Sequence, residues 1–299
     1  MRNCLITGAT GLIGSHLLSV LPMEWQVYCL SRKPYQGNHA KRSVAYITAD
    51  LTNPLHYSAL PPNVEAVIHL AQSEHFREFP NKAYDVFQVN VASTLQLLEY
   101  ARQAGARTLV LASSGGVYGH HDHEFSEDVA VTANADLGFY LGTKLCAEIM
   151  AENYTPFMNI IVLRFFFVYG AGQRKSMLIP RLVQSVQEAR AITLQGEDGI
   201  RINPTYVLDA ANAIVRALDL DGSHKINVGG PEVLSLRQIG EVIGRALTRE
   251  PKFELQRAVQ PHHLVGDIGK MAQLLGPPHI RFEEGINMVL TQEGVHRDG

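Results

Sequence analysis

The chain has 299 residues, of which 46% are apolar and 18% are charged, and its formal net charge is −3. This composition excludes intrinsic disorder, because disordered chains are poor in apolar residues and carry a large excess of one charge. It also excludes the basic footprint of a nucleic-acid-binding protein, since acidic and basic residues are interspersed. The length suffices for one large domain, or a large domain with a smaller lobe, around a substantial core.

Neither a membrane segment nor a metal or disulfide framework is visible in the sequence. No stretch reaches the roughly 18 continuous apolar residues of a spanning helix, and the N-terminal residues lead into a strand pattern without a signal peptide. The three cysteines, Cys4, Cys29 and Cys146, lack paired spacing and are interpreted as small buried hydrophobic residues. We therefore expect a soluble cytoplasmic protein with no membrane partner, no nucleic-acid partner and no bound metal.

Strand and helix patterns alternate through the first half of the chain. Strands are predicted near 4–6, 26–30, 44–47, 66–70, 108–112 and 159–163. Helices are predicted over 12–21 and 82–104, and another begins at Phe139. This order is typical of an α/β fold with a Rossmann-type, doubly wound parallel sheet, in which ligands bind at the carboxyl ends of the strands.

The pattern changes after Gly170. Helices are predicted near 178–188 and 208–218 and after Ser235, with a glycine-rich break at 196–199. We predict a dinucleotide-binding Rossmann domain over residues 1–165 and a smaller C-terminal substrate-binding lobe over 166–299. Residues 203–220 are expected to pack back on the Rossmann domain.

Three glycines at three-residue spacing connect the first predicted strand to the first predicted helix. Such spacing lets the backbone turn tightly and lets a pyrophosphate approach the N–H groups of the helix N-terminus. A plain tight turn is the alternative interpretation. The cofactor contacts predicted in this turn are Gly8, Thr10, Gly11, Leu12, Ile13 and Gly14.

The end of the second predicted strand bears on the type of dinucleotide. NAD enzymes place Asp or Glu there against the ribose hydroxyls, whereas NADP enzymes favour Arg. This strand ends in Ser31, Arg32 and Lys33 without an acid, and a hydroxyl with two cations suits a 2′-phosphate. We predict NADP, with NAD as the alternative, because surface cations after a strand are common. After the third strand, Asp50, followed by Leu51, either contacts the adenine or simply caps a turn.

Two further segments suggest redox chemistry at an alcohol or carbonyl group. Tyr140 and Lys144 are four residues apart, so both can share one helical face, and Ser114 follows a strand. A phenol is a poor base at neutral pH, but an adjacent ammonium and a positive nicotinamide favour the phenolate. We predict that Ser114 holds the substrate oxygen, that Tyr140 exchanges its proton and that Lys144 assists.

Together these motifs resemble the extended short-chain dehydrogenase/reductase family, of the NAD-dependent epimerase/dehydratase type. The motifs that carry the resemblance lie at 7–14, 50–51, 69–71, 90–91, 113–119, 140–144, 163–170, 201–209 and 227–230. The resemblance implies a six- or seven-stranded Rossmann domain, a nucleotide-diphosphate sugar as substrate and a homodimer formed through the helices at 82–104 and 140–153. The expected cofactor contacts then also include Leu70, Ala71, Asn90, Tyr140 and Lys144.

Two departures from the family pattern narrow the reaction. Dehydratases of this family carry an Asp-Glu pair directly after the Ser or Thr, whereas this chain has Gly115 and Gly116. Dehydration is therefore disfavoured, which leaves epimerisation through a 4-keto intermediate or net reduction of a keto sugar. The second departure is Phe167, at a position where many relatives have an Asn that contacts the substrate phosphate.

The remaining candidates concern the substrate. Arg201 lies where relatives place an arginine against the diphosphate, although a surface arginine is the alternative. Tyr118 and Phe167 are predicted to line the pocket, and Phe165 and Phe166 to lie in the core. His120, His121, Asp122 and His123 are interpreted as a solvated loop rather than a metal site.

Three functions remain open on the sequence. The first is an NAD(P)-dependent epimerase or 4-keto reductase acting on a nucleotide-linked sugar. The second is an NADP-dependent reductase of a smaller carbonyl compound, which Phe167 and the modest length favour. The third is a non-catalytic dinucleotide-binding protein, although such proteins tend to lose the Tyr and Lys that this chain retains.

Overall fold

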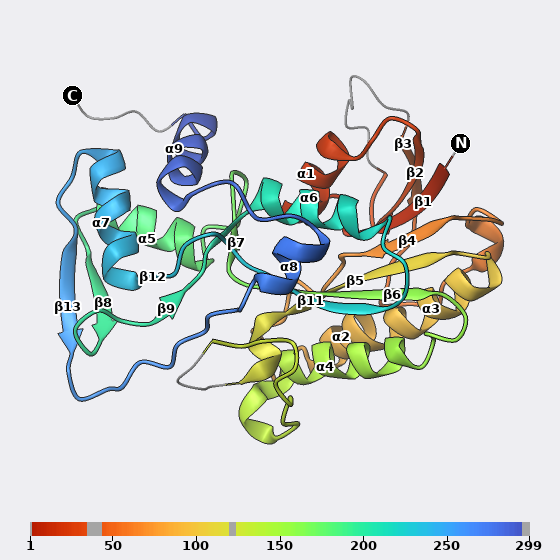
Figure 1. Cartoon of the computed structure of the whole chain (residues 1–299), viewed down its shortest axis with the longest axis horizontal. Coiled ribbons are helices and arrows are strands. Elements are labelled where there is room, and N and C mark those ends of the chain that lie inside the picture. Colours follow the sequence, from red (N-terminus) through yellow and green to blue (C-terminus); the bar gives the residue numbers. More distant parts are fainter. Residues whose placement is uncertain (1, 35–43, 120–123, 295–299) are drawn as a thin grey trace. The chain divides into compact units, whose positions relative to one another are not determined.

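The computed structural model describes residues 2–34, 44–119 and 124–294 (Figure 1). The chain forms two compact units, which are described separately. The first comprises Met1–Gly119, Ala130–Arg164 and Ala211–Ile226, and the second comprises His120–Val129, Phe165–Ala210 and Asn227–Gly299. The predicted boundary lay between 165 and 166, with residues 203–220 expected to pack back on the Rossmann domain, and residues 211–226 belong to the first unit. The functional roles predicted for the two parts stay predictions.

A seven-stranded sheet forms the centre of the first unit, with the order β11-β6-β5-β4-β1-β2-β3. The strands are β1 Arg2–Thr7, β2 Trp25–Ser31, β3 Val44–Thr48, β4 Ala66–His69, β5 Thr108–Ser114, β6 Asn159–Phe165 and β11 His224–Val228. The pairs β1–β2, β2–β3, β1–β4 and β4–β5 are parallel, which confirms the predicted doubly wound sheet. The chain reverses its direction of travel across the sheet between β1 and β4, and ligands of such sheets bind at the carboxyl ends of the strands at this point.

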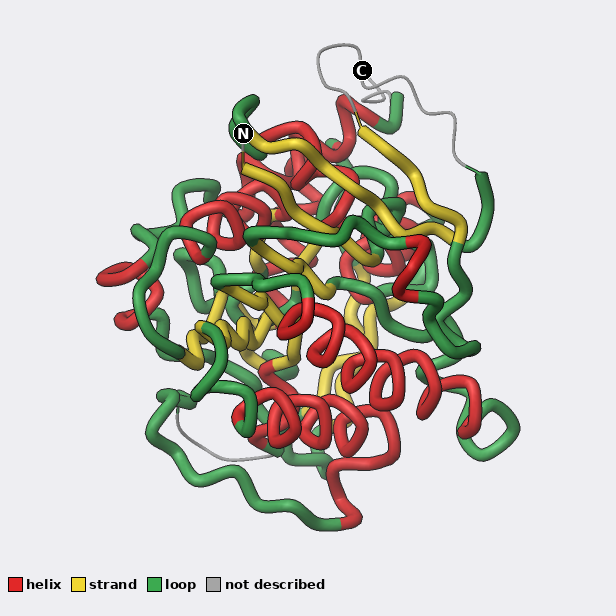
Figure 2. Tube along the Cα trace, turned by 90° about the vertical axis from the view of Figure 1, so that its right-hand side faces the viewer, coloured by secondary structure: helices red, strands yellow, loops and turns green. Residues whose placement is uncertain are grey.

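Helices cover both sides of this sheet. Helix α1 (Leu12–Val20) lies on one side, and α2 (Ala83–Phe87), α3 (Ser93–Gln103) and α4 (Gly138–Glu152) lie on the other (Figure 1). The long predicted helix over 82–104 is interrupted by a π-helical turn at Gln88–Ala92 between α2 and α3. Helices α3 and α4 pack against each other, and Figure 2 shows them side by side below the strands.

Apolar side chains from the sheet and from these helices form the core of the first unit. Leu5, Val67 and Leu109 of the strands pack with Leu97 of α3 and Ala147 of α4, and all are almost fully buried. Alternate residues of the strands face this layer, which is the pattern expected of a sheet covered on both faces. The core therefore holds rigid the strand ends at which the site residues lie.

The second unit combines short strand pairs with helices. Its paired strands are β7 (Val168–Tyr169) with β10 (Thr205–Tyr206), β8 (Ala191–Gln195) with β13 (Lys252–Gln256), and β9 (Arg201–Ile202) with β12 (Leu234–Ser235). Its helices are α5 (Leu178–Gln187), α7 (Leu236–Leu247), α8 (Gly269–Leu274) and α9 (Phe282–Gln292), while α6 (Val207–Ala217) crosses the division between the units.

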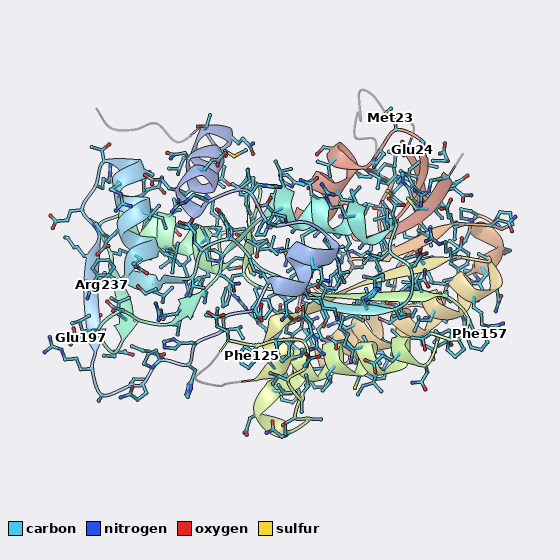
Figure 3. All side chains as sticks on the ribbon, in the orientation of Figure 1. Met23, Glu24, Phe125, Phe157, Glu197 and Arg237 are labelled. Carbon is cyan, nitrogen blue, oxygen red and sulfur yellow. The ribbon has the colours of Figure 1, made fainter. Side chains whose placement is uncertain are left out.

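Helix α7 begins where the sequence predicted, because Ser235 and Gln238 form a capping box at its first turn. In the same turn Arg237 Nη2 donates to the Glu197 carbonyl at 2.8 Å (Figure 3). Within the described residues, no helix is both long and apolar enough to cross a membrane.

Candidate active site

The glycine loop between β1 and α1 is shaped by close backbone approaches. Gly8 has φ +74°, and a Cβ there would lie 2.7 Å from the Ala71 nitrogen, while a Cβ on Gly14 would lie 2.2 Å from the Gly8 oxygen. No other residue fits these two positions. Gly11, the N-cap of α1, places no side chain over the helix end, so the first-turn N–H groups can meet an anion.

The other residues predicted in this turn lie where a ligand can reach them. Thr10 and Gly11 are exposed, and Leu12 and Ile13 are half-buried at the start of α1. The loop therefore fits the pyrophosphate of a dinucleotide in both shape and electrostatics, although contact with each residue stays a prediction.

A buried hydrogen-bond chain fixes the neighbouring strand end against this loop. The Thr94 hydroxyl donates to the Asn90 carbonyl at 2.8 Å, so its oxygen accepts from His69 Nε2–H at 3.1 Å. His69 Nδ1 then accepts from the Thr7 hydroxyl at 2.6 Å, and Thr7 Oγ1 in turn accepts from the Ala71 N–H at 3.2 Å. In this series of hydrogen bonds, His69 donates through Nε2 and accepts through Nδ1, so the imidazole must be neutral. Burial accordingly lowers the pKa of His69 to about 3.

Asn90 ties two segments of the site together. Its Oδ1 accepts from the Ser73 N–H at 2.9 Å, and its Nδ2 donates to Thr143 Oγ1 at 3.0 Å. The Thr143 hydroxyl donates to the Tyr140 carbonyl at 2.6 Å. Asn90 therefore orients the turn of α4 that carries Tyr140, while its predicted cofactor contact is untested.

The charge at the end of β2 differs from the charge that the local sequence predicts, because a carboxylate from another segment pairs with Arg32. Arg32 Nη1 forms an ion pair with Glu74 Oε1 at 2.7 Å, and the Ser31 hydroxyl donates to the Lys33 carbonyl at 2.8 Å. Glu74 follows β4, and its pairing with Arg32 has no signal in the sequence. Asp50 Oδ1 accepts from the Thr52 N–H at 3.0 Å, which is the turn-capping interaction that the sequence analysis left open.

Helix α4 presents Tyr140 and Lys144 on one face, and both are anchored to strand ends. Lys144 is buried, and its Nζ donates to the carbonyl of Ala112 in β5 at 3.0 Å. The Tyr140 hydroxyl donates to Gln72 Oε1, just beyond β4, at 2.9 Å. The Phe76 ring packs on the Tyr140 ring with a centroid separation of 5.0 Å.

The titration of this pair is governed by burial. Burial raises the pKa of Tyr140 to about 12, against the opposing charge of Arg77. Burial lowers the pKa of Lys144 to about 8, against the opposing charge of Glu148. The charge of Arg77 favours the Tyr140 phenolate, and sequence reasoning missed both Arg77 and Gln72. The predicted assistance of Lys144 stays a prediction.

Ser114 lies at the carboxyl end of β5, next to the helix that carries Tyr140. Its Oγ accepts from the Gly116 N–H at 3.2 Å, and its side chain is half-buried. A Cβ on Gly116 would lie 2.9 Å from Leu141 Cδ2, so α4 packs tightly over this turn. Ser114 is thus held at the strand end where substrate is expected.

A buried ion pair is bonded to Ser113, the residue before Ser114 in β5. The Ser113 hydroxyl donates to Glu148, and Glu148 pairs with Arg164 Nη2 at 2.6 Å, with both charged side chains at most 2% exposed. The Arg164 guanidinium lies 4.6 Å from the Tyr118 ring centroid. Tyr118 is itself buried, so its observed contact is with Arg164, and its predicted role in the substrate pocket is not shown.

The predicted substrate residues of the second unit are only partly enclosed. Phe167 is half-buried with φ +42°, a strained value for a non-glycine residue, and its carbonyl accepts from the Thr205 N–H at 3.2 Å. Arg201 is exposed, and its N–H donates to His263 Nδ1 at 3.1 Å. Phe165 and Phe166 are buried, as predicted.

The predicted histidine loop lies outside the described residues. It comprises His120, His121, Asp122 and His123. Among residues 2–34, 44–119 and 124–294, no cluster of three or more His, Cys, Asp or Glu side chains is arranged to hold a metal ion.

Comparison with known proteins adds independent information. Residues 4–229 match the model of the NAD dependent epimerase/dehydratase family. A UDP-glucuronate 4-epimerase of Thermodesulfobacterium geofontis is 30% identical over 97% of this chain and 96% of its own length. A solved UDP-glucuronic acid 4-epimerase of Bacillus cereus in complex with UDP-glucuronic acid and NAD is 26% identical, has a TM-score of 0.85, and is matched over 98% of this chain and 100% of that one. MoeE5 in complex with UDP-glucuronic acid and NAD is 27% identical with a TM-score of 0.82, over 98% of this chain and 100% of that one.

Proposed function

Since this chain belongs to the NAD dependent epimerase/dehydratase family, as its sequence resemblance indicated, we propose that it is an NAD-dependent 4-epimerase of a nucleotide-linked sugar. The observation that carries this proposal is the anchored pair of Tyr140 and Lys144, with glycines following Ser114 where a dehydratase would need acids. UDP-glucuronic acid is the proposed substrate.

The proposed cofactor is NAD, which replaces the NADP predicted from the sequence. That prediction rested on Ser31, Arg32 and Lys33 at the end of β2, but the ion pair with Glu74 occupies part of the Arg32 guanidinium. The solved relatives at 26% and 27% identity are complexes with NAD. Gly8, Gly11 and Gly14 would hold the pyrophosphate. When bound, the nicotinamide accepts a hydride from the sugar and returns it.

Tyr140 is proposed to move the proton of the sugar 4-hydroxyl. As a phenolate, Tyr140 takes this proton when the 4-keto sugar forms, and the resulting hydroxyl returns it when the ketone is reduced on the opposite face. Because burial disfavours the phenolate, Tyr140 needs positive charge nearby, and Arg77 supplies part of it. Ser114 is proposed to donate a hydrogen bond to the same sugar oxygen.

The glycines after Ser114 favour epimerisation over dehydration. Water elimination needs an acid and a base beside the sugar, and neither Gly115 nor Gly116 has a group to supply them. A side chain at Gly116 would also require the Leu141 side chain to shift. We therefore expect no 4-keto-6-deoxy product from dTDP-, GDP- or CDP-linked hexoses.

The charge around Tyr140 supports an anionic sugar. Arg77 is exposed, and its charge acts on the Tyr140 hydroxyl. A uronic acid places its carboxylate on the carbon next to C4, where an arginine near the reacting hydroxyl can pair with it. In the second unit, Arg201 is proposed to bind the substrate diphosphate, with Phe167 beside the substrate.

Assembly as a homodimer remains part of the proposal. Helices α2, α3 and α4 carry large apolar side chains that are at least 45% exposed, namely Tyr84, Phe87, Leu95 and Ile149. A second copy of the same helices would cover this surface, as in the two-fold dimers that are commonest among oligomers.

The test is conversion of UDP-glucuronic acid to UDP-galacturonic acid, followed by chromatography and proton NMR with NAD supplied. Tyr140→Phe should retain NAD binding but lose about 10²–10⁴-fold in turnover, because it removes the group that exchanges the proton. UDP-glucose serves as the uncharged comparison substrate. Full activity of Tyr140→Phe, or no epimerisation of either sugar, would contradict the proposal.

A further inference from the structure

The end of β2 lacks the acidic residue that ordinarily selects NAD, yet the structure supplies a carboxylate at that place from elsewhere. We propose that Glu74, acting through its ion pair with Arg32, sets the dinucleotide selectivity of this site in favour of NAD. The inference rests on the proposed function only in that the site takes a nicotinamide dinucleotide, whatever the sugar.

Several carboxylates act on the charge of Arg32. Glu74 Oε1 lies 2.7 Å from Arg32 Nη1 and is the main cause of the raised pKa of this guanidinium. The carboxylates of Asp50 and Asp85 act on the same guanidinium in the same direction. One arginine is therefore paired with Glu74 and is acted on by the charges of two further carboxylates, which come from the segment after β3 and from helix α2.

The carboxylates near Arg32 disfavour the binding of a 2′-phosphate. A phosphate monoester carries about −1.5 to −2 charge at neutral pH, so near Arg32 it would also approach Glu74 and Asp50. Its bidentate recognition would also need guanidinium N–H groups, of which the ion pair already engages Nη1. The ribose of NAD has hydroxyls instead, which donate to carboxylates without repulsion. Glu74 thus supplies the carboxylate that NAD enzymes ordinarily carry at the end of β2.

Glu74 is held in place by its neighbour. The Ser73 N–H donates to Asn90 Oδ1, and the Ser73 hydroxyl donates to Asp85, so the backbone before Glu74 is tied to α2 and to the π-helical turn. The Arg32 and Glu74 side chains are 64% and 36% exposed. Such a pair contributes little to stability, so removing it should change the local charge without unfolding the protein.

The experiment measures the dissociation constants of NAD⁺ and NADP⁺ by calorimetry, on protein freed of bound dinucleotide and without sugar. Glu74→Gln keeps the shape of the side chain and removes its charge. This variant should tighten NADP⁺ about 10- to 100-fold relative to NAD⁺, as expected for one charge-assisted bond to phosphate. The double variant Glu74→Gln/Arg32→Gln should lose most of that gain, because the released arginine is what binds the phosphate.

The matched control is Glu78→Gln, which removes the same charge from the same segment but from a side chain bonded to His75. It should leave the NADP⁺/NAD⁺ ratio unchanged. The inference is overturned if the NADP⁺/NAD⁺ affinity ratio changes less than about twofold in Glu74→Gln, or if it changes equally in Glu78→Gln. It is also overturned if the wild type binds neither dinucleotide. If the ratio shifts as expected but UDP-glucuronic acid is not converted, the selectivity role stands and the proposed substrate fails.

Discussion

Replacing His69 with Gln should remove a pH dependence of stability that originates beneath the glycine loop. The native pKa of His69 is about 3, whereas an unfolded histidine titrates near 6.5. Between these values the unfolded chain binds a proton that the native protein does not, so stability is full above pH 6.5 and falls as the pH drops. The hydrogen bonds to Thr7 and Thr94 require this neutral imidazole.

The size of the effect depends mainly on the unfolded state. At pH 5 an unfolded histidine lies about 1.5 units below its pKa, and each unit is worth about 1.4 kcal/mol, so His69 lowers the free energy of unfolding by about 2 kcal/mol relative to pH 8. The result changes little if the native pKa lies anywhere below about 4. His69→Gln itself should cost about 1–3 kcal/mol at both pH values through disturbed hydrogen bonds.

The assay is urea unfolding at pH 8 and pH 5, followed by the fluorescence of Trp25. This is the single tryptophan of the sequence, and it is buried in β2 of the first unit. The loss of stability from pH 8 to pH 5 should be about 2 kcal/mol smaller in His69→Gln than in the wild type. His56→Gln, which changes an exposed imidazole, should retain the wild-type loss. Equal losses in the wild type and His69→Gln would refute a buried neutral His69.

Three further predictions concern the ion pair, the substrate phosphate and the assembly. Arg164→Met leaves the Glu148 carboxylate buried without its ion-pair partner. It should lower the free energy of unfolding by about 3–5 kcal/mol in the same assay. A change below about 1 kcal/mol would show that this carboxylate is not charged. Arg201→Ala should raise KM for UDP-glucuronic acid about tenfold or more with unchanged NAD affinity, and an unchanged KM would remove Arg201 from the substrate site. Leu95→Glu should convert the proposed dimer into monomers in sedimentation experiments, because the dimer interface would bury the new charge. Met23→Glu, at an exposed position outside these helices, is the control. A wild type that sediments as a monomer contradicts the proposed dimer.

Local patterns in the sequence sufficed for much of the fold and for the positions of the main site elements. Alternating strands and helices predicted the doubly wound sheet, and the spacing of Gly8, Gly11 and Gly14 predicted the tight turn before α1. The separation of Tyr140 from Lys144 placed both on one face of α4. These features depend on residues within a few positions of one another, where helical and strand periodicity decides the geometry.

Only the tertiary structure decided the electrostatics of the site. Arg32 gains a carboxylate from Glu74, Tyr140 gains Gln72 and the charge of Arg77, and the proton positions on His69 follow from β1 and α3. Each partner lies dozens of residues away in the chain and arrives through a strand order that no local spacing encodes. Because charge and hydrogen bonding act through space, the choice between NADP and NAD cannot be drawn from one strand end alone, and the pairing of Arg32 with Glu74 supports the proposed NAD.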